Sequence, residues 1–135
     1  MIITIDVSAA IEVVMGRPKQ KKIIDILEKA EWIIAPSLYI YEASNVMWKY
    51  NILQKYPVED LLHKIRHMIE MVDQFIKAED LYEEAIPLAC KLKHPTYDIM
   101  YLVVSRRKNA TLVTLDSKLI DIAKKLDIPV AAIDE

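Results

Sequence analysis

Four acidic residues stand apart from the other charges of this sequence, because each lies in or beside an apolar segment. They are Asp6, Glu42, Asp98 and Asp116. A carboxylate in apolar surroundings costs free energy unless a second group compensates its charge. Carboxylate oxygens are the ligands that hard divalent cations prefer. If the fold brings these acids together, they could hold such a cation.

Two of the four acids follow predicted strands. Asp6 ends the apolar run Met1–Ile5, and Asp116 ends the run Leu112–Leu115, which has the length of a short strand. In open α/β sheets, ligands bind outside the carboxyl ends of the strands. We therefore expect Asp6 and Asp116 to lie at the ligand-binding edge of a sheet.

The other two acids lie on predicted helices. Asp98 lies in the first turn of a helix that is predicted to start at its N-cap, Thr96, and to stop at Asn109. The first two turns of this helix have no polar face, so we expect the helix to be buried. Glu42 is the one acid on a largely apolar helix that begins at Pro36-Ser37.

Each acid also has a purely structural explanation. Asp98 would be favoured in a first turn by the helix dipole, and aspartates such as Asp6 and Asp116 are common in turns. Glu42 could form a salt bridge with Lys49 or with a distant arginine. The set as a whole favours a metal site, because acids at two strand ends and in one first turn can converge on a cation.

The remaining segments alternate between predicted helices and strands. Helices are predicted over 9–14 with Ser8 as N-cap, around 23–27, over 58–72, over 79–93 with a kink or break at Pro87, and over 117–126 with Ser117 as N-cap. Further strands are predicted over 32–35, 74–77 and, at an edge, 129–133. This alternation predicts an α/β fold in a single domain, residues 1–135, with a mostly parallel sheet covered on both faces.

Composition excludes several function classes. Gly16 is the only glycine, which excludes a P-loop and a glycine-rich dinucleotide-binding turn. The net charge of −2 excludes a basic nucleic-acid coat protein, but RNA remains a possible substrate because bound cations would reverse the local charge. The single cysteine, Cys90, can form no intrachain disulfide and is expected to pack on its helix. With neither a signal peptide nor a membrane-spanning run recognised, we expect a cytoplasmic location and no membrane partner.

Two other groups of residues could bind ligands. A basic loop could either be solvated or contact an RNA phosphate backbone, and its members are Arg17, Lys19, Lys21 and Lys22. His63 and His67 have the i, i+4 spacing of zinc ligands, but no glutamate lies between them and no third ligand is apparent. We expect the two histidines to lie on a solvated helix face.

The order and local context of the four acids resemble the PIN domain family, in particular the VapC-type toxins of toxin–antitoxin pairs. Four segments carry the resemblance, which spans essentially the whole chain: Ile3–Ser8, Pro36–Glu42, Tyr97–Leu102 and Leu112–Asp116. The chain departs from the family pattern at Val7, where Thr or Ser is common, and at Lys118, where some members carry a further acid. The second departure bears on the strength of any second metal site.

The resemblance implies an α/β/α sandwich that acts as a Mg²⁺- or Mn²⁺-dependent endoribonuclease. It implies that Asp6 and Asp116 are metal ligands and that Asp98 is a direct or water-mediated ligand. Glu42 would orient or deprotonate the attacking water, and Ser8 and Thr114 would support the site. It also implies an RNA substrate and an antitoxin partner with a basic segment.

The resemblance further implies a homodimer, and the aromatic residues near one helix end, Trp48, Tyr50 and Tyr56, independently predict self-association. Two other functions remain open. The first is a catalytically silent binding or scaffold module with the same fold. The second is a Mg²⁺-dependent phosphotransfer domain like a receiver, although the sequence lacks the acidic pair at the first strand end and the mid-sheet aspartate that such a domain needs.

Overall fold

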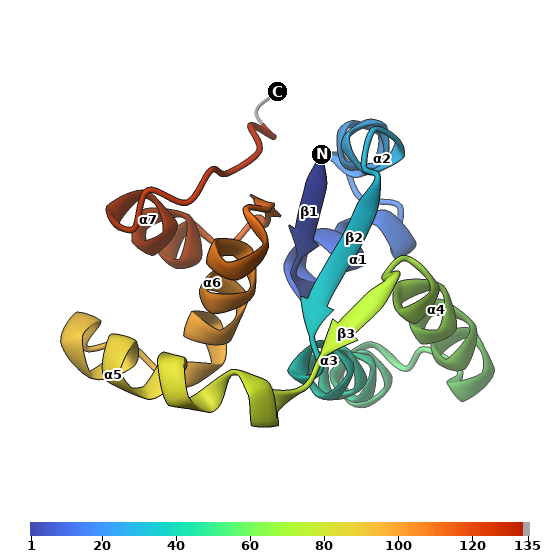
Figure 1. Ribbon diagram of the computed structural model, residues 1–135. Helices are drawn as coiled ribbons and strands as arrows, with labels where there is room; N and C mark the ends of the chain where they lie inside the picture. Colours follow the sequence, from blue (N-terminus) through green and yellow to red (C-terminus); the bar gives the residue numbers. More distant parts are fainter. Residues whose placement is uncertain (134–135) are drawn as a thin grey trace.

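A computed structural model describes residues 1–133, which form a single domain around one four-stranded, all-parallel sheet (Figure 1). The strands are β1 (Ile2–Ile5), β2 (Trp32–Pro36), β3 (Gln74–Ile76) and β4 (Thr111–Val113). Their order across the sheet is β3-β2-β1-β4. The predicted α/β fold with a parallel sheet is confirmed.

The first strand is central and the last strand pairs with it. Ile3 of β1 is in register with Ile33 of β2 on one side and with Thr111 of β4 on the other. The chain adds β2 and β3 on one side of β1 and then returns to place β4 on the opposite side. The carboxyl ends of β1 and β4 therefore form the topological switch point, where open α/β sheets bind their ligands.

Helices cover both faces of the sheet (Figure 1). In the view of Figure 1, α5, α6 and α7 lie to the left of the sheet, and α2 and α4 lie to its right. The described residues contain seven α-helices and one 3₁₀ helix: α1 (Val7–Val14), α2 (Gln20–Glu28), α3 (Leu38–Gln54), α4 (Val58–Glu70), η1 (Ala78–Asp80), α5 (Tyr82–Leu92), α6 (Thr96–Lys108) and α7 (Ser117–Lys125).

Helix α6 is buried as its sequence predicts. Ile99, Leu102 and Val103 are completely buried, and the helix packs against β1, β2 and β4. Asn109 ends it in the left-handed conformation, with a φ of 50°. A continuous apolar segment thus places Asp98, in its first turn, next to the sheet.

The N-caps of two helices differ from the prediction. Asp6 caps α1 by accepting a hydrogen bond from the backbone N–H of Ala9, and Asp116 caps α7 in the same manner. The predicted caps, Ser8 and Ser117, are already helical. Asp6 directly follows β1, whereas β4 ends at Val113, earlier than predicted, and Asp116 lies three residues beyond it. Both aspartates occupy the N-cap position, which Asp favours as strongly as Ser.

The predicted N-cap of α6 is also wrong. Thr96 is the first helical residue, and Pro95 precedes it without a side-chain hydrogen bond to the helix. Proline restricts the residue before it and cannot extend a helix backwards, so the helix begins immediately after Pro95.

The predicted helix over 79–93 is divided, but not at its proline. The break lies between η1 and α5, and Pro87 is accommodated inside α5. A proline in this position removes one hydrogen bond to the carbonyl of Glu83, which lies in the exposed first turn. Cys90, on the same helix, is exposed rather than packed.

The predicted last strand, 129–133, is reduced to a bridge. Leu112 donates a backbone hydrogen bond to Pro129 (2.8 Å) and accepts one from Ala131 (2.9 Å), so only Val130 pairs with β4. Proline lacks an N–H group and cannot donate to the ladder, which limits pairing at this edge.

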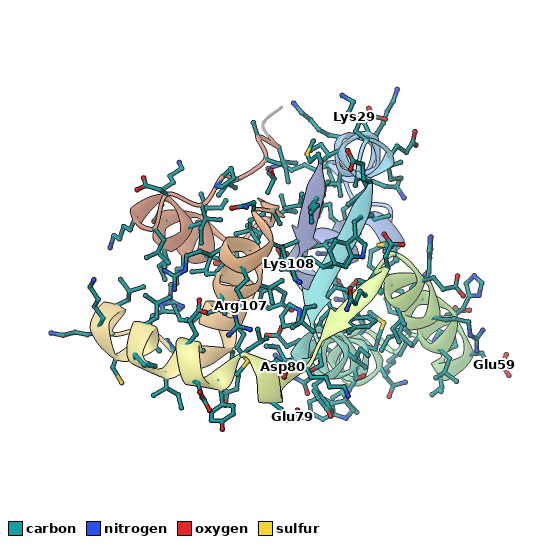
Figure 2. All side chains as sticks on the ribbon, in the orientation of Figure 1. Lys29, Glu59, Glu79, Asp80, Arg107 and Lys108 are labelled. Atoms are coloured by element: carbon teal, nitrogen blue, oxygen red, sulfur yellow. The ribbon has the colours of Figure 1, made fainter. Side chains whose placement is uncertain are left out.

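The cationic last turn of α6 is held by its neighbours (Figure 2). Arg106 and Arg107 each pair with Glu84 of α5, at 2.9 and 3.0 Å. Arg107 also donates to the carbonyl of Asp80 in η1, and the Lys108 ammonium lies 5.7 Å from the centre of the Trp32 ring. These partly exposed contacts orient α6 more than they stabilise the fold.

Within residues 1–133, none of the helices combines the length and the apolar character that a membrane span requires.

Candidate active site

Asp6 is the buried centre of a hydrogen-bond network at the carboxyl end of β1. Asp6 is 6% exposed, and its Oδ1 accepts hydrogen bonds from the Ser8 hydroxyl (2.7 Å) and the Ala9 backbone N–H (3.1 Å). Oδ2 accepts a hydrogen bond from the Thr114 hydroxyl. Both residues that the sequence assigned a supporting role therefore bond directly to Asp6.

The two hydroxyl groups join the end of β1 to the segment that follows β4. The Ser8 oxygen accepts a hydrogen bond from the Leu115 N–H (2.9 Å), and the Thr114 oxygen accepts one from the Asp116 N–H (3.0 Å). Because both hydroxyl protons are directed at the carboxylate, this network is complete when Asp6 is ionised. It fixes Asp116 close to Asp6 through backbone contacts.

One carboxylate oxygen of Asp116 caps the N-terminus of α7. Its Oδ1 accepts hydrogen bonds from the backbone N–H groups of Lys118 (2.9 Å) and Leu119 (3.4 Å), at the start of α7. Its Oδ2 has no hydrogen-bond partner among residues 1–133. One carboxylate oxygen thus orients the side chain and the other remains available.

Asp98 is paired with a histidine that sequence reasoning missed. The Nε2 atom of His94 lies 2.7 Å from Oδ2 of Asp98, and the two side chains are 15% and 31% exposed. His94 lies just before α6, four residues from Asp98, and this i, i+4 spacing was a signal that could have been read from the sequence.

Glu42 is oriented by a buried tyrosine from another helix. The hydroxyl of Tyr101, a residue of α6 that is 2% exposed, donates a 2.7 Å hydrogen bond to Oε1 of Glu42 on α3. The alternative pairing with Lys49 does not occur among the described residues. The sequence placed Tyr101 in an apolar run and gave no indication of this contact.

The acids perturb one another electrostatically. Burial raises the pKa of Asp6 to about 6 from an ordinary value of 3.8, against the hydrogen bonds that favour the ionised form, and the charge of Asp116 adds to the increase. Burial also raises the pKa of Glu42; the Tyr101 hydrogen bond opposes this, and the charges of Asp98, Asp6 and Asp116 reinforce it. The four carboxylates therefore share one electrostatic environment.

A model of the PIN domain family matches residues 3–125. The chain belongs to the PIN domain family. PIN domains are commonly metal-dependent nucleases. Membership of this family leaves the receiver-like phosphotransfer alternative without support.

Several solved chains resemble this PIN domain in fold, and one of them illustrates the likeness. It is the crystal structure of PAE2754 from Pyrobaculum aerophilum, with a TM-score of 0.70 and 24% sequence identity. The match covers 88% of this chain and 77% of that chain. No curated protein matches this sequence.

The donor chemistry of the site fits a hard divalent cation. The four carboxylates influence one another electrostatically and form no ion pair with any lysine or arginine among the described residues, and carboxylate oxygens suit Mg²⁺ and Mn²⁺. However, within residues 1–133 no three His, Cys, Asp or Glu side chains are arranged to hold one ion directly. A divalent cation held here would therefore keep several waters and take one or two carboxylates as ligands, as Mg²⁺ commonly does.

Three of the four basic-loop residues of this PIN domain line one hollow, and Arg17 packs elsewhere. Arg17 donates a hydrogen bond to the Tyr50 hydroxyl and lies over the Tyr50 ring. Lys19 lines a hollow of about 260 Å³ together with Thr114, which follows β4, and Lys124 of α7. Lys19 also lines a second hollow, of about 520 Å³ beside α2, together with Lys21 and Lys22. Of the four predicted RNA contacts, Lys19 is the one that shares a hollow with a residue of the acidic site.

Two further expectations concern α3 and α4. His63 and His67 are both exposed on α4, as predicted, and belong to no metal-ligand group among the described residues. Of the aromatic residues expected on an exposed patch, only Trp48 is largely exposed, at 57%. Tyr50 is buried and Tyr56 is partly buried, and the two rings pack edge to face with centres 5.3 Å apart.

Proposed function

We propose that this PIN domain is a Mg²⁺- or Mn²⁺-dependent endoribonuclease that hydrolyses RNA phosphodiester bonds. One observation carries the proposal: four carboxylates share an environment at the switch point of a parallel sheet, without a lysine or arginine ion pair to any of them within the described residues. A binding surface for a neutral or anionic ligand would need no such concentration of negative charge. A cation bridging the site to a phosphate does need it.

The residues divide into metal-holding and water-orienting groups. Asp116, Asp98 and Asp6 would hold the ion, directly or through water. When bound, the ion would supply Lewis acidity at the phosphoryl oxygen and lower the pKa of the attacking water. Ser8 and Thr114 hold the carboxylate of Asp6 in one orientation.

Glu42 would orient the attacking water and accept its proton. Burial shifts the pKa of Glu42 towards neutral pH, and a general base is most effective when its pKa lies near the pH of the reaction. The Tyr101 hydrogen bond fixes Oε1 and leaves Oε2 without a partner among residues 1–133. Oε2 is therefore the atom that we assign to proton transfer.

The proposal extends to a VapC-like toxin that is held inactive by an antitoxin. A basic segment of a partner protein would be attracted by the uncompensated acids, because opposite charges in a poorly solvated cleft interact strongly. The proposed homodimer rests on exposed apolar side chains along α3 and at the start of α4: Trp48, Ile52, Leu53 and Val58. Exposed apolar side chains of this kind commonly mark an interface.

Cleavage of a panel of structured RNAs, with Mn²⁺ and with EDTA, tests the proposal. Wild type is expected to cut at least one RNA in Mn²⁺ and none in EDTA. Asp98→Asn and Asp116→Asn are expected to reduce the rate at least a hundredfold while the far-UV circular dichroism is unchanged. Asp121→Asn, which alters an exposed acid of α7, is the matched control and should retain full activity. RNA binding without cleavage would favour the silent binding module instead.

A further inference from the structure

A hollow of about 470 Å³ opens between the start of α3 and the start of α6. It is lined by Leu38, Tyr41, Glu42, Asn45 and Tyr97. This volume lies within the range of small-ligand pockets, about 300 to 1,000 Å³. Glu42 belongs both to this hollow and to the acidic site, so a ligand in the hollow would lie beside the candidate reaction centre.

The hollow presents two tyrosines to solvent. Tyr41 is 76% exposed and Tyr97 is 66% exposed, although they come from different helices. Within residues 1–133, neither ring stacks on another aromatic ring and neither hydroxyl forms a hydrogen bond. Their aromatic faces are therefore available to a planar ligand, and tyrosine offers a rigid face at low entropic cost because it has few rotatable bonds.

We propose that this hollow binds an unpaired nucleobase of the RNA substrate, next to the phosphate that is attacked. The inference rests on the proposed nuclease function. Sequence-specific and sequence-tolerant proteins alike bind single-stranded RNA by stacking bases on tyrosine rings. The exposed amide of Asn45 supplies both a donor and an acceptor for the edge of a base.

The position of the hollow gives the subsite a catalytic consequence. A base held by Tyr41 or Tyr97 fixes the adjoining sugar and phosphate relative to Glu42, whose own orientation is set by Tyr101. Positioning of this kind lowers the barrier by removing freedom before the reaction. A base within a duplex is stacked on both faces, so the subsite selects single-stranded loops and ends.

Binding of a fluorescein-labelled, unstructured 12-nucleotide RNA, followed by anisotropy, tests the subsite. Ca²⁺ replaces Mg²⁺ or Mn²⁺, because it binds carboxylate oxygens, and a gel confirms that the probe stays intact. Tyr41→Leu and Tyr97→Leu are each expected to weaken binding roughly tenfold, as loss of one stacked base does. Tyr41→Phe and Tyr97→Phe should bind within twofold of wild type, because stacking requires the ring and not the hydroxyl.

Two controls separate stacking from other effects. Tyr82→Leu removes an exposed tyrosine of α5 that is 46% exposed and lies outside the hollow, so it should leave RNA binding unchanged. A ribose-phosphate oligomer of the same length without bases should bind wild type and both leucine variants equally. Equal losses for the RNA and for the oligomer without bases would overturn the subsite, and so would leucine variants that bind RNA as wild type does.

The alternative occupant is a second copy of the chain. Tyr41 and Trp48 lie two turns apart on α3, so a self-association surface that covers Trp48 could also cover Tyr41. Light scattering on each leucine variant decides this: a lower mass that accompanies the loss of RNA binding would assign the tyrosines to the interface and overturn the subsite.

The two proposals fail separately. If RNA is bound in a manner that depends on Tyr41 and Tyr97 but is not cleaved in Mn²⁺, the subsite stands and the nuclease function does not. If RNA is cleaved and the leucine variants bind normally, the nuclease function stands and the subsite does not. A protein that neither binds nor cleaves RNA contradicts both.

Discussion

The hydroxyl of Tyr101 donates a 2.7 Å hydrogen bond to Oε1 of Glu42, across the contact between α6 and α3. The tyrosine is 2% exposed, so the bond is protected from water on the side of α6. Burial and the Glu42 charge raise the pKa of Tyr101, which keeps the hydroxyl protonated and therefore a donor. The bond makes the orientation of Glu42 a property of the packed core.

Replacement of this hydroxyl should slow RNA cleavage by acting through Glu42. Tyr101→Phe keeps the ring and removes the donor, and a hydrogen bond to a charged group contributes about 1.5–3 kcal/mol. We expect kcat to fall roughly ten- to a hundredfold, with little change in KM. In a Glu42→Gln background the same substitution should cost no further activity, because residues that act as one unit are not additive. Equal losses in both backgrounds would show that Tyr101 contributes only packing.

The buried carboxyl group of Asp6 should make the metal-free protein less stable as pH rises. Its folded-state pKa of about 6 exceeds the ordinary value of 3.8, so between these values the folded state binds a proton that the unfolded state has lost. The resulting stabilisation is complete below about pH 4 and is lost as pH rises to about 6, by roughly 3 kcal/mol for a difference of this size.

Urea unfolding in EDTA between pH 4 and pH 8 measures this effect as the difference between wild type and Asp6→Asn. The free energy of unfolding of wild type should fall relative to the variant as pH rises, because asparagine does not titrate. Asp121→Asn, at an exposed position, should follow wild type throughout. A constant difference between wild type and Asp6→Asn would show that Asp6 titrates normally.

Divalent cations should stabilise the folded protein if the acids hold an ion. At a hundredfold excess over the dissociation constant, Mn²⁺ should add about 2.7 kcal/mol by mass action. Asp116→Asn should respond much less, whereas its stability in EDTA should be nearly unchanged, because asparagine is as good an N-cap for α7 as aspartate. Melting temperatures in EDTA and in Mn²⁺ give both comparisons. An equal Mn²⁺ response in the two proteins would remove Asp116 from the metal site.

The apolar surface of α3 and α4 should mediate self-association. Trp48 and Val58 are 57% and 60% exposed and border the same hollow, so pairing of two copies would remove them from water. Light scattering at micromolar concentration should report a dimer, and Trp48→Glu should lower the mass towards that of one chain. A monomeric wild type would contradict this expectation.

The parts of the fold that could be predicted are those with local signals. The α6 segment is flanked by Pro95 and by Asn109, and both ends lie where these residues place them. Asp6 directly follows β1, so its position at a strand end could be read directly, whereas β4 ends at Val113, three residues before Asp116. The last strand, 129–133, was overestimated, because its apolar residues pair with β4 only at Val130.

The contacts that define the site depend on how helices are rotated against one another, and this has no local signal. Glu42 and Tyr101 are separated by 59 residues, and each reads as part of an apolar helix. The choice of Asp6 over Ser8 as N-cap depends on the length of the connection after β1, since both residue types suit that position. Only the pairing of His94 with Asp98 was accessible from spacing alone.

The pairing of the first strand with the last has a consequence for the chain during synthesis. Asp6 and Thr114 are 108 residues apart, so a nascent chain already exposes Asp6 long before its partners are translated. Neither Thr114 nor Asp116 can join it until β4 has left the ribosome and docked against β1. Contacts between such distant residues also form late in folding. The chain therefore passes through most of its synthesis with the acidic site unassembled, and the site can form only after β4 and the residues that follow it have been translated.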